Sequence, residues 1–288
     1  MHVRHLTLKD FRSYPSAELA LTPGVTTLVG LNGQGKTNLV EAIGYLATLG
    51  SHRVATDQPL VRFGAAQAVV RGAVVRDGRE TMVELEITPG RANRARLGKS
   101  PVARPRDVLG TLRTVLFAPE DLALVKGDPS ERRRYLDDLL VQRQPRWSGV
   151  RSDYDKVLKQ RNALLKSAAP VLRRGARRGG RHTASLQPLD EAQESALHTL
   201  DVWNDHLATV GSQLLYARLR LLRDLVPDLA DCYDAVSAGQ SRARATYKSS
   251  LHEEMATRLA AGEVPEIEEL RAALLATLEE LRSNEIER

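Results

Sequence analysis

Eight consecutive residues near the N-terminus have the types and the spacing that bind a nucleoside triphosphate. The segment Gly30-Leu31-Asn32-Gly33-Gln34-Gly35-Lys36-Thr37 matches the pattern G-x-x-x-x-G-K-[ST]. Its glycines let the backbone curl so that successive N–H groups point at phosphate oxygens. Lys36 is expected to reach the β- and γ-phosphates, and the Thr37 hydroxyl is expected to ligate Mg²⁺. Gly30–Thr37 is therefore the predicted site for ATP or GTP.

A strand and a helix are expected to hold this loop. Val25–Val29 is an apolar run that predicts a β-strand, and Thr37–Leu49 has apolar residues at helical spacing. The start of such a helix directs the positive end of its dipole toward a bound phosphate. Other short strands are predicted at Val3–Leu8, Ala17–Leu21, Ala68–Arg76, Thr81–Thr88 and Thr114–Phe117. Asp77-Gly78 predicts a hairpin turn between two of them.

After Pro119 the pattern becomes helical. A helix is predicted to begin at Pro129 behind an Asp128 cap, with Tyr135, Leu136, Leu139 and Leu140 in its buried stripe, and to end before Pro145. Further helices are predicted over 150–165, over 200–225 before Pro227, and over 267–281, and Arg173–His182 is predicted to be a loop. Leu207, Val210 and Leu214 follow coiled-coil-like spacing and are expected to be buried. The predicted fold class is α/β, with an ATPase lobe over 1–118 and a mainly helical lobe over 119–288.

The charge of the chain is distributed unevenly. The formal net charge is +6, and Pro129–His182 alone contains 15 Lys and Arg against 5 Asp and Glu. Such a stretch is expected to bind a nucleic-acid backbone independently of sequence, although a solvated helical surface is the simpler alternative. The candidate DNA-binding residues are Arg132, Arg133, Arg134, Arg173, Arg174, Arg177, Arg178 and Arg181.

Composition excludes several classes of protein. Hydrophobic residues make up 42% and charged residues 27%, which is typical of a globular chain. Cys232 is the only cysteine, so neither an internal disulfide nor a cysteine-rich zinc site can form. No apolar run is long enough to span a bilayer, and the N-terminus lacks the apolar stretch of a signal peptide. A cytoplasmic protein is expected.

The segment Pro119–Asp137 closely resembles the signature segment of the bacterial RecF family of DNA replication and repair proteins. The resemblance extends to Asp10-Phe11-Arg12-Ser13-Tyr14, to the run from Asn32 to Asn38 and to Gly50-Ser51-His52-Arg53. It implies an ABC-type ATPase head, related to SMC heads, with ATP and Mg²⁺ as cofactors. It also implies single-stranded or gapped DNA as a ligand, RecR and RecO-type partners, an ATP-dependent homodimer, and roles in recombinational repair and the SOS response.

The resemblance also implies parts that these residues lack. Family members are expected to place a Walker B strand and an ABC signature loop beyond Arg288, so the chain is interpreted as C-terminally truncated. Neither Val115-Leu116-Phe117 nor Leu229-Ala230-Asp231 provides a Walker B strand. Nucleotide binding is therefore predicted and hydrolysis is left open. Two other classes stay open, a P-loop kinase for small molecules and a structural head that binds ATP without turnover.

Overall fold

The computed structural model describes residues 1–177 and 190–287. The chain divides into two compact units, Met1–Arg146 and Trp147–Arg288. The segment 119–146 therefore groups with the first unit, whereas the sequence predicts the helical lobe from residue 119. One reason is that α3 (Pro129–Arg143) contacts the phosphate-loop helix α1 (Lys36–Thr48).

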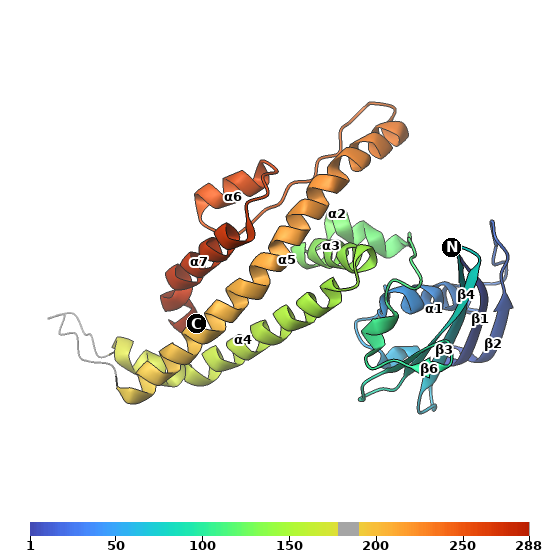
Figure 1. Ribbon diagram of the computed structural model, residues 1–288, viewed down its shortest axis with the longest axis horizontal. Helices are drawn as coiled ribbons and strands as arrows, with labels where there is room; N and C mark the ends of the chain where they lie inside the picture. The colour runs from blue at the N-terminus through green and yellow to red at the C-terminus, as the bar shows by residue number, and fades with distance from the viewer. Residues whose placement is uncertain (178–189, 288) are drawn as a thin grey trace. The chain divides into compact units, whose positions relative to one another are not determined.

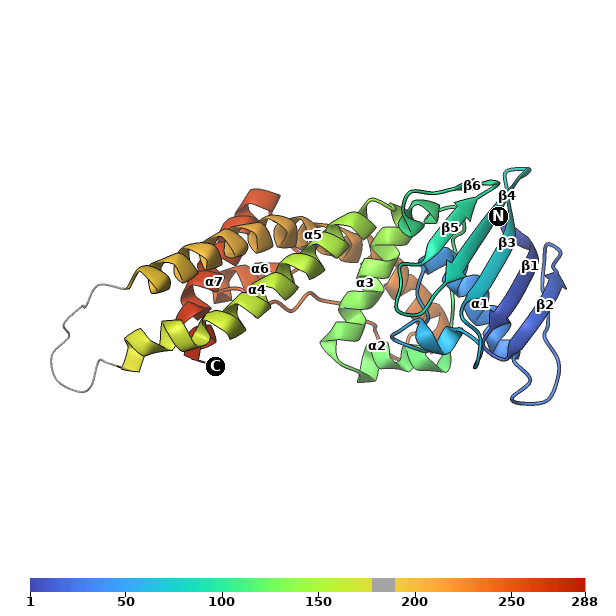
Figure 2. The ribbon, with the colours of Figure 1, turned by 90° about the horizontal axis from the view of Figure 1, so that it is seen from below.

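The first unit is built on one antiparallel sheet of six strands in the order β2-β1-β3-β4-β5-β6 (Figure 2). The strands are β1 His2–Phe11, β2 Tyr14–Ala20, β3 Ala68–Arg76, β4 Arg79–Ile87, β5 Arg94–Leu97 and β6 Ser100–Pro101. The predicted hairpin is confirmed, because Asp77 and Gly78 have φ values of 49° and 75° between β3 and β4. These left-handed conformations match the twist of the flanking strands.

Helix α1 covers one face of this sheet and closes the core of the first unit. Tyr45 and Leu46 are buried on α1 among Leu8, Phe11 and other apolar side chains of the strands. The contact is close at Gly72 of β3, where a Cβ atom would lie 2.6 Å from Leu46 Cδ1. The shorter helices are η1 Gln58–Leu60, η2 Pro105–Val108, η3 Pro119–Leu122 and α2 Ala123–Lys126.

Two predicted strands, Val25–Val29 and Thr114–Phe117, do not belong to the sheet or to any strand. Four of their apolar side chains face solvent, with Val25 98%, Val29 90%, Val115 99% and Phe117 92% exposed, whereas Leu28 and Leu116 are half-buried. A strand forms only when a neighbour accepts and donates its backbone hydrogen bonds. Within the described residues neither segment has such a neighbour, so neither forms a strand despite its β-like sequence pattern.

Tyr135 is expected in the buried stripe of α3, and this prediction is wrong. Asp128 and Pro129 start the helix as predicted, although the Asp128 side chain does not cap it. The buried residues are Asp137 and Leu140, whereas Tyr135 is 40% exposed. At about 100° per residue, Tyr135 lies about 200° around the helix from Asp137, which turns its ring to the opposite side.

The second unit is helical, with α4 Trp147–Arg177, α5 Glu191–Ser237, α6 Glu253–Ala260 and α7 Ile267–Glu287 (Figure 1). Helices α4, α5 and α7 contact one another in pairs. Asp190 begins α5 with a capping box, because its carboxylate accepts the Gln193 N–H. None of the helices in the described part of the chain is both long and apolar enough to cross a bilayer.

Two predicted boundaries in this unit are wrong. Helix α4 runs through Arg177, so Arg173, Arg174 and Arg177 are helical rather than part of a loop, whereas residues 178–182 lie outside the described residues. Extending an existing helix gains one hydrogen bond per residue. This gain outweighs the cost of about 1 kcal/mol for an internal glycine such as Gly175. Helix α5 also continues past Pro227. Arg223 and Pro227 are exposed, so water can bond the carbonyl that the proline leaves without a partner.

The packing of α5 in the second unit predicts how two substitutions change the free energy of unfolding. Leu207 and Leu214 are 9% and 2% exposed, as expected from their spacing, whereas Val210 is only half-buried. Leu214→Ala is expected to lower the free energy of unfolding by about 2–5 kcal/mol, because it leaves a cavity. Val202→Ala on the same helix, where the side chain is 46% exposed, is expected to change it by about 0.5 kcal/mol or less. Urea denaturation of both variants measures the difference, and equal midpoints would contradict the described packing.

Candidate nucleotide-binding site

The glycine-rich loop adopts a backbone that only glycine accommodates. Gly33 and Gly35 have φ values of 83° and 93°, in the left-handed region. A Cβ atom on Gly35 would lie 2.9 Å from Ser13 Oγ and 2.9 Å from Tyr14 Cε2. The Tyr14 hydroxyl donates to the Gln34 carbonyl at 3.3 Å, which fixes the end of β1 and the start of β2 against the loop.

The start of α1 leaves a row of backbone donors without partners. The N–H groups of Asn38 and Leu39 donate to the Gly35 carbonyl at 2.8 and 3.3 Å. In the described part of the chain, no acceptor meets the N–H groups of residues 33–37. These donors, together with the positive end of the helix dipole, form a site for an anion.

Lys36 lies against the loop that precedes it. Its Nζ atom donates to the carbonyl oxygens of Gly30 at 2.7 Å and Leu31 at 2.8 Å. The ammonium group is thus held at the loop by two neutral acceptors. A phosphate oxygen can replace them, because hydrogen bonds between charged groups are shorter and stronger than bonds to carbonyls.

A buried carboxylate, Glu41, connects α1 to two other segments. Its side chain is 0% exposed. Arg12 Nε donates to Oε2 at 2.9 Å and Arg12 Nη2 to Oε1 at 2.6 Å. Ser51 Oγ donates to Oε1 at 2.5 Å, and Arg53 Nη1 to Oε2 at 3.3 Å. Two cations and a hydroxyl therefore satisfy this carboxylate from three directions.

The same network reaches the phosphate loop through Asn38. Arg53 Nη1 donates to Asn38 Oδ1 at 3.0 Å, and Asn38 Nδ2 donates to Ser13 Oγ at 3.0 Å. Ser13 is the residue that a Cβ on Gly35 would strike. The segments 10–14, 32–38 and 50–53, which are far apart in the sequence, are thus brought together around the first turns of α1.

Burial alone would raise the pKa of Glu41, but its partners reverse the direction. Hydrogen bonds from Arg12 and Ser51, and the charges of Arg12 and Arg53, hold the pKa of this carboxyl below its usual range. Sequence reasoning did not single out Glu41. The signal was a lone carboxylate on the helix face that carries Ala42, Tyr45 and other buried residues.

The backbone beside this network is strained. Asp10 and Arg12 have φ values of 49° and 53°, which cost non-glycine residues roughly 1–3 kcal/mol each. Arg62 Nε donates to Asp10 Oδ1 at 2.7 Å, and Arg12 Nη1 donates to the Pro59 carbonyl at 2.9 Å. These bonds offset the strain and fix the Arg12 guanidinium on Glu41.

The predicted DNA-binding arginines of α3 have different surroundings. Arg132 Nη1 donates to the carbonyls of Leu124 at 3.1 Å and Gly127 at 3.0 Å, so it closes the end of α2. Arg134 pairs with Glu131 at 3.9 Å and Asp138 at 3.8 Å. Arg133 is exposed and has no ion pair with any residue that the structure describes.

The other predicted arginines are in the second unit. Arg173, Arg174 and Arg177 lie on the last turns of α4. Their side chains, and both Arg178 and Arg181, lie outside the described residues. The structure therefore leaves the role of these five arginines as a prediction.

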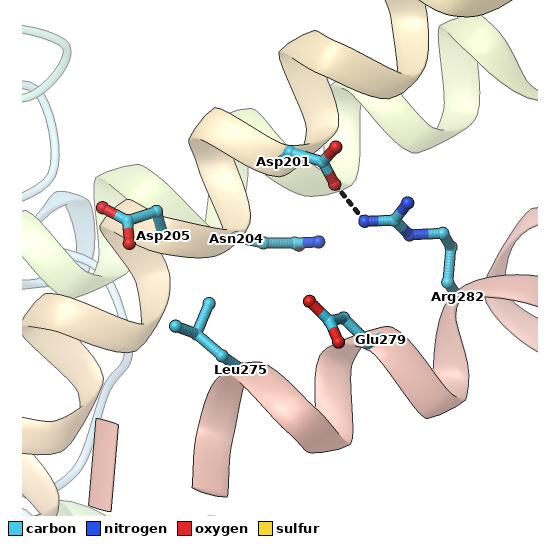
Figure 3. Close-up of a pocket in the computed structure, with 6 residues that line it drawn as sticks. All are labelled: Asp201, Asn204, Asp205, Leu275, Glu279 and Arg282. Carbon is cyan, nitrogen blue, oxygen red and sulfur yellow. Dashed lines mark hydrogen bonds and ion pairs between the residues drawn. The ribbon is translucent and has the colours of Figure 1, made fainter. Parts of the chain in front are cut away.

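A separate hollow of about 530 Å³ lies between α5 and α7 in the second unit (Figure 3). It is lined by Asp201, Asn204, Asp205, Leu275, Glu279 and Arg282. Arg282 pairs with Asp201 across it, and Arg271 pairs with Asp205 at 2.5 Å beside it. The sequence did not predict this hollow, whose lining has three carboxylates and one arginine.

The loop, the helix behind it and the attached sheet define the fold class of the protein, which is that of the α/β P-loop ATPases. A model of an AAA domain matches residues 5–104. A solved structure of the recombination mediator protein RecF, titled with ATPrS, superposes with a TM-score of 0.81 at 24% identity, over 99% of this chain and 69% of that one. The predicted fold class, an ABC/SMC-type P-loop ATPase with a helical region, is confirmed.

Curated relatives define the family. The chain is 60% identical over 291 residues to the DNA replication and repair protein RecF of Kineococcus radiotolerans, which covers 100% of this chain and 70% of that protein. It is 54% identical over 288 residues to the RecF protein of Streptomyces avermitilis, of which it also spans 70%. The chain belongs to the RecF family of DNA replication and repair proteins.

Proposed function

We propose that this protein binds ATP with Mg²⁺ at Gly30–Thr37 and binds single-stranded or gapped DNA in recombinational repair and the SOS response. The observation that carries the nucleotide part is the row of N–H groups at residues 33–37, which meet no acceptor among the described residues and lie beside the ammonium group of Lys36. The DNA part is supported by the names of the relatives, which are DNA replication and repair proteins. A solved structural relative is titled with ATP.

The residues present fit a nucleotide. The absence of a side chain on Gly35, and the free donors that follow it, suit a triphosphate chain. Lys36 would hold the β- and γ-phosphates and Thr37, which is exposed, would ligate Mg²⁺. Thr37 and the phosphate oxygens are proposed to hold Mg²⁺. Among the residues the structure describes, no cluster of His, Cys, Asp or Glu is suited to a metal. When bound, ATP would supply a cleavable phosphoanhydride bond and the negative charge of its triphosphate.

No residue is assigned to activate water for hydrolysis. Glu41 is the buried carboxylate beside the loop, but two arginines and a serine already occupy both of its oxygens. A low pKa also makes it a weak proton acceptor. The role of Glu41 in this proposal is to position Arg12 and Arg53 beside the loop.

Partners and location follow from the same proposal. RecR and RecO-type mediators are proposed partners, since a structural relative is described within the RecFOR pathway. An ATP-dependent homodimer is proposed from the family resemblance. Because chromosomal DNA is the proposed ligand, the protein is proposed to act in the cytoplasm.

Two glycine-to-alanine substitutions, one in the loop and one in the helix that follows it, test the nucleotide assignment. Gly35→Ala places a methyl group 2.9 Å from Ser13 and Tyr14 at a φ of 93°, so it is expected to distort the loop and abolish binding of a fluorescent ATP analogue. Gly44→Ala, inside α1, meets nothing within 4 Å and is expected to bind the analogue normally while stabilising the helix by about 0.5–1 kcal/mol. Fluorescence titration with Mg²⁺ measures both variants. Normal binding by Gly35→Ala would remove the phosphate site from this loop.

A further inference from the structure

The segment 91–106 has an unusual charge. It contains six cations and no carboxylate. These residues are Arg91, Arg94, Arg96, Lys99, Arg104 and Arg106, here called the cationic edge. The segment alone has as much positive charge as the net charge of the whole chain, +6.

The cationic edge follows one border of the sheet. Strands β5 and β6 lie at the end of the strand order opposite β2, as Figure 2 shows. Arg94 and Arg96 flank the buried Ala95, so both side chains project from the outer face of β5. They are 81% and 59% exposed and about 7 Å apart along the strand. The border therefore presents a row of accessible guanidinium groups.

The backbone of this border is held in place. Asn93 Nδ2 donates to Tyr45 Oη at 3.0 Å and to Asp57 Oδ2 at 2.6 Å, which ties the loop before β5 to the core. The N–H of Gly98 donates to the Met82 carbonyl at 2.7 Å. A ligand that binds here therefore meets cations on a positioned scaffold and not on a free tail.

The carboxylates near these cations hold them only loosely. Arg94 lies 3.9 Å from Glu86, and Arg96 lies 3.8 Å from Glu84. Because the arginines of these pairs are largely exposed and the pairs are long, each pair contributes about 0–1 kcal/mol, so exchange for a phosphate costs little. Arg91, Lys99 and Arg106 have no ion pair with any residue in the described ranges.

Protection of a sheet edge does not explain this many charges. Lysine and proline are common protections against edge-to-edge pairing, and Lys99 in the β5–β6 turn and Pro101 in β6 already provide both. The opposite edge, β2, has only one charged residue, Glu18. The excess is thus specific to the β5–β6 border.

We propose that the cationic edge is a contact surface for the phosphate backbone of nucleic acid. The inference rests on the proposed DNA-binding function and adds a surface on the first unit to the arginines of α3 and α4. The segment contains no aromatic residue, so it offers no platform for base stacking. Its contacts are therefore with phosphates and are indifferent to base sequence.

A charge-neutralising triple variant tests this surface. Arg91→Gln, Lys99→Gln and Arg106→Gln together remove three cations of the edge that have no ion pair with a described residue. A matched control, Arg4→Gln with Arg76→Gln and Arg79→Gln, removes three cations elsewhere on the same sheet. Fluorescence anisotropy of the 288-residue chain, with labelled gapped DNA, ATP and Mg²⁺ over a series of salt concentrations, reports affinity and its salt dependence. Thermal melting checks that both variants fold.

The expected result is a change in the salt slope. Each lost phosphate contact reduces the slope of log K against log salt by about 0.9 and, at 0.1 M salt, the affinity by about eightfold. If two or three phosphate contacts are lost, the slope of the test variant is expected to be smaller by about 2–3 and its affinity lower by about 60- to 500-fold. The control triple is expected to keep a slope near that of the unmodified chain.

Other outcomes overturn the proposal at different levels. A test variant that matches the control, while the unmodified chain binds DNA, removes the cationic edge from the DNA surface and leaves the proposed function standing. Absence of DNA binding by the unmodified chain contradicts the proposed function itself. If the test variant loses binding to labelled polyglutamate but keeps binding to DNA, the edge recognises an acidic protein surface instead.

Discussion

Lys36→Ala is expected to reduce the affinity for an ATP analogue by about 100-fold or more. Its ammonium group now donates to the Gly30 and Leu31 carbonyls and is the cation placed to meet the β- and γ-phosphates. A hydrogen bond to a charged group contributes about 1.5–3 kcal/mol, and Lys36 offers more than one. Isothermal titration with a non-hydrolysable analogue and Mg²⁺ measures the loss.

Two further variants test whether that loss of affinity comes from the position and geometry of the Lys36 ammonium group. Lys9→Ala removes an exposed lysine from the outer face of the sheet and is expected to leave the affinity unchanged. Lys36→Arg keeps the charge but not the compact geometry, so intermediate binding is expected. If Lys36→Ala binds as tightly as Lys9→Ala, the nucleotide does not occupy this loop.

Glu41→Ala is expected to destabilise the first unit by about 3–5 kcal/mol. Removing this carboxylate leaves the Arg12 guanidinium, whose side chain is 15% exposed, without its counter-charge. Glu41→Gln keeps the shape and part of the hydrogen bonding, so it separates the loss of charge from the loss of packing. Thermal or urea denaturation measures all three proteins, and a stability of Glu41→Ala equal to that of the unmodified chain would contradict the described network.

The same carboxylate makes stability depend on pH. Because the pKa of Glu41 is lowered in the folded chain, the folded state favours the carboxylate more than the unfolded state does. The stabilisation is complete above the unfolded pKa of about 4.3 and is lost as the pH falls through the lower, folded value. The stability difference between the unmodified chain and Glu41→Gln is therefore expected to shrink in that acidic range. A difference that stays constant from neutral pH to pH 3 would show that the charge of Glu41 contributes nothing.

Local features of the structure could be predicted from sequence because their causes are local. The Asp77-Gly78 turn, the helix after Lys36 and the start of a helix at Pro129 each depend on a few adjacent residues. Pro227 shows the limit of such rules, since solvent around the exposed helix compensates for the broken hydrogen bond.

Features that depend on distant residues could not be predicted in this way. The pattern of Val25–Val29 is that of a strand, but a pattern does not supply a hydrogen-bonded neighbour. Glu41 lies 29 residues from Arg12 in the sequence, and only the fold brings the two together. The motifs at residues 10–14 and 50–53 are each recognisable in the sequence, whereas only the fold shows that the Glu41 carboxylate joins them.

The two apolar segments without strand structure, Val25–Val29 and Thr114–Phe117, are expected to affect how this chain behaves in concentrated solution. Each combines solvent-facing valine or phenylalanine with backbone groups that no strand occupies, which is a template for adding a strand from another molecule. Repulsion between molecules of net charge +6 opposes that encounter. Added salt screens the repulsion and leaves the apolar attraction intact, so we expect the colloidal stability of the chain to fall as ionic strength rises.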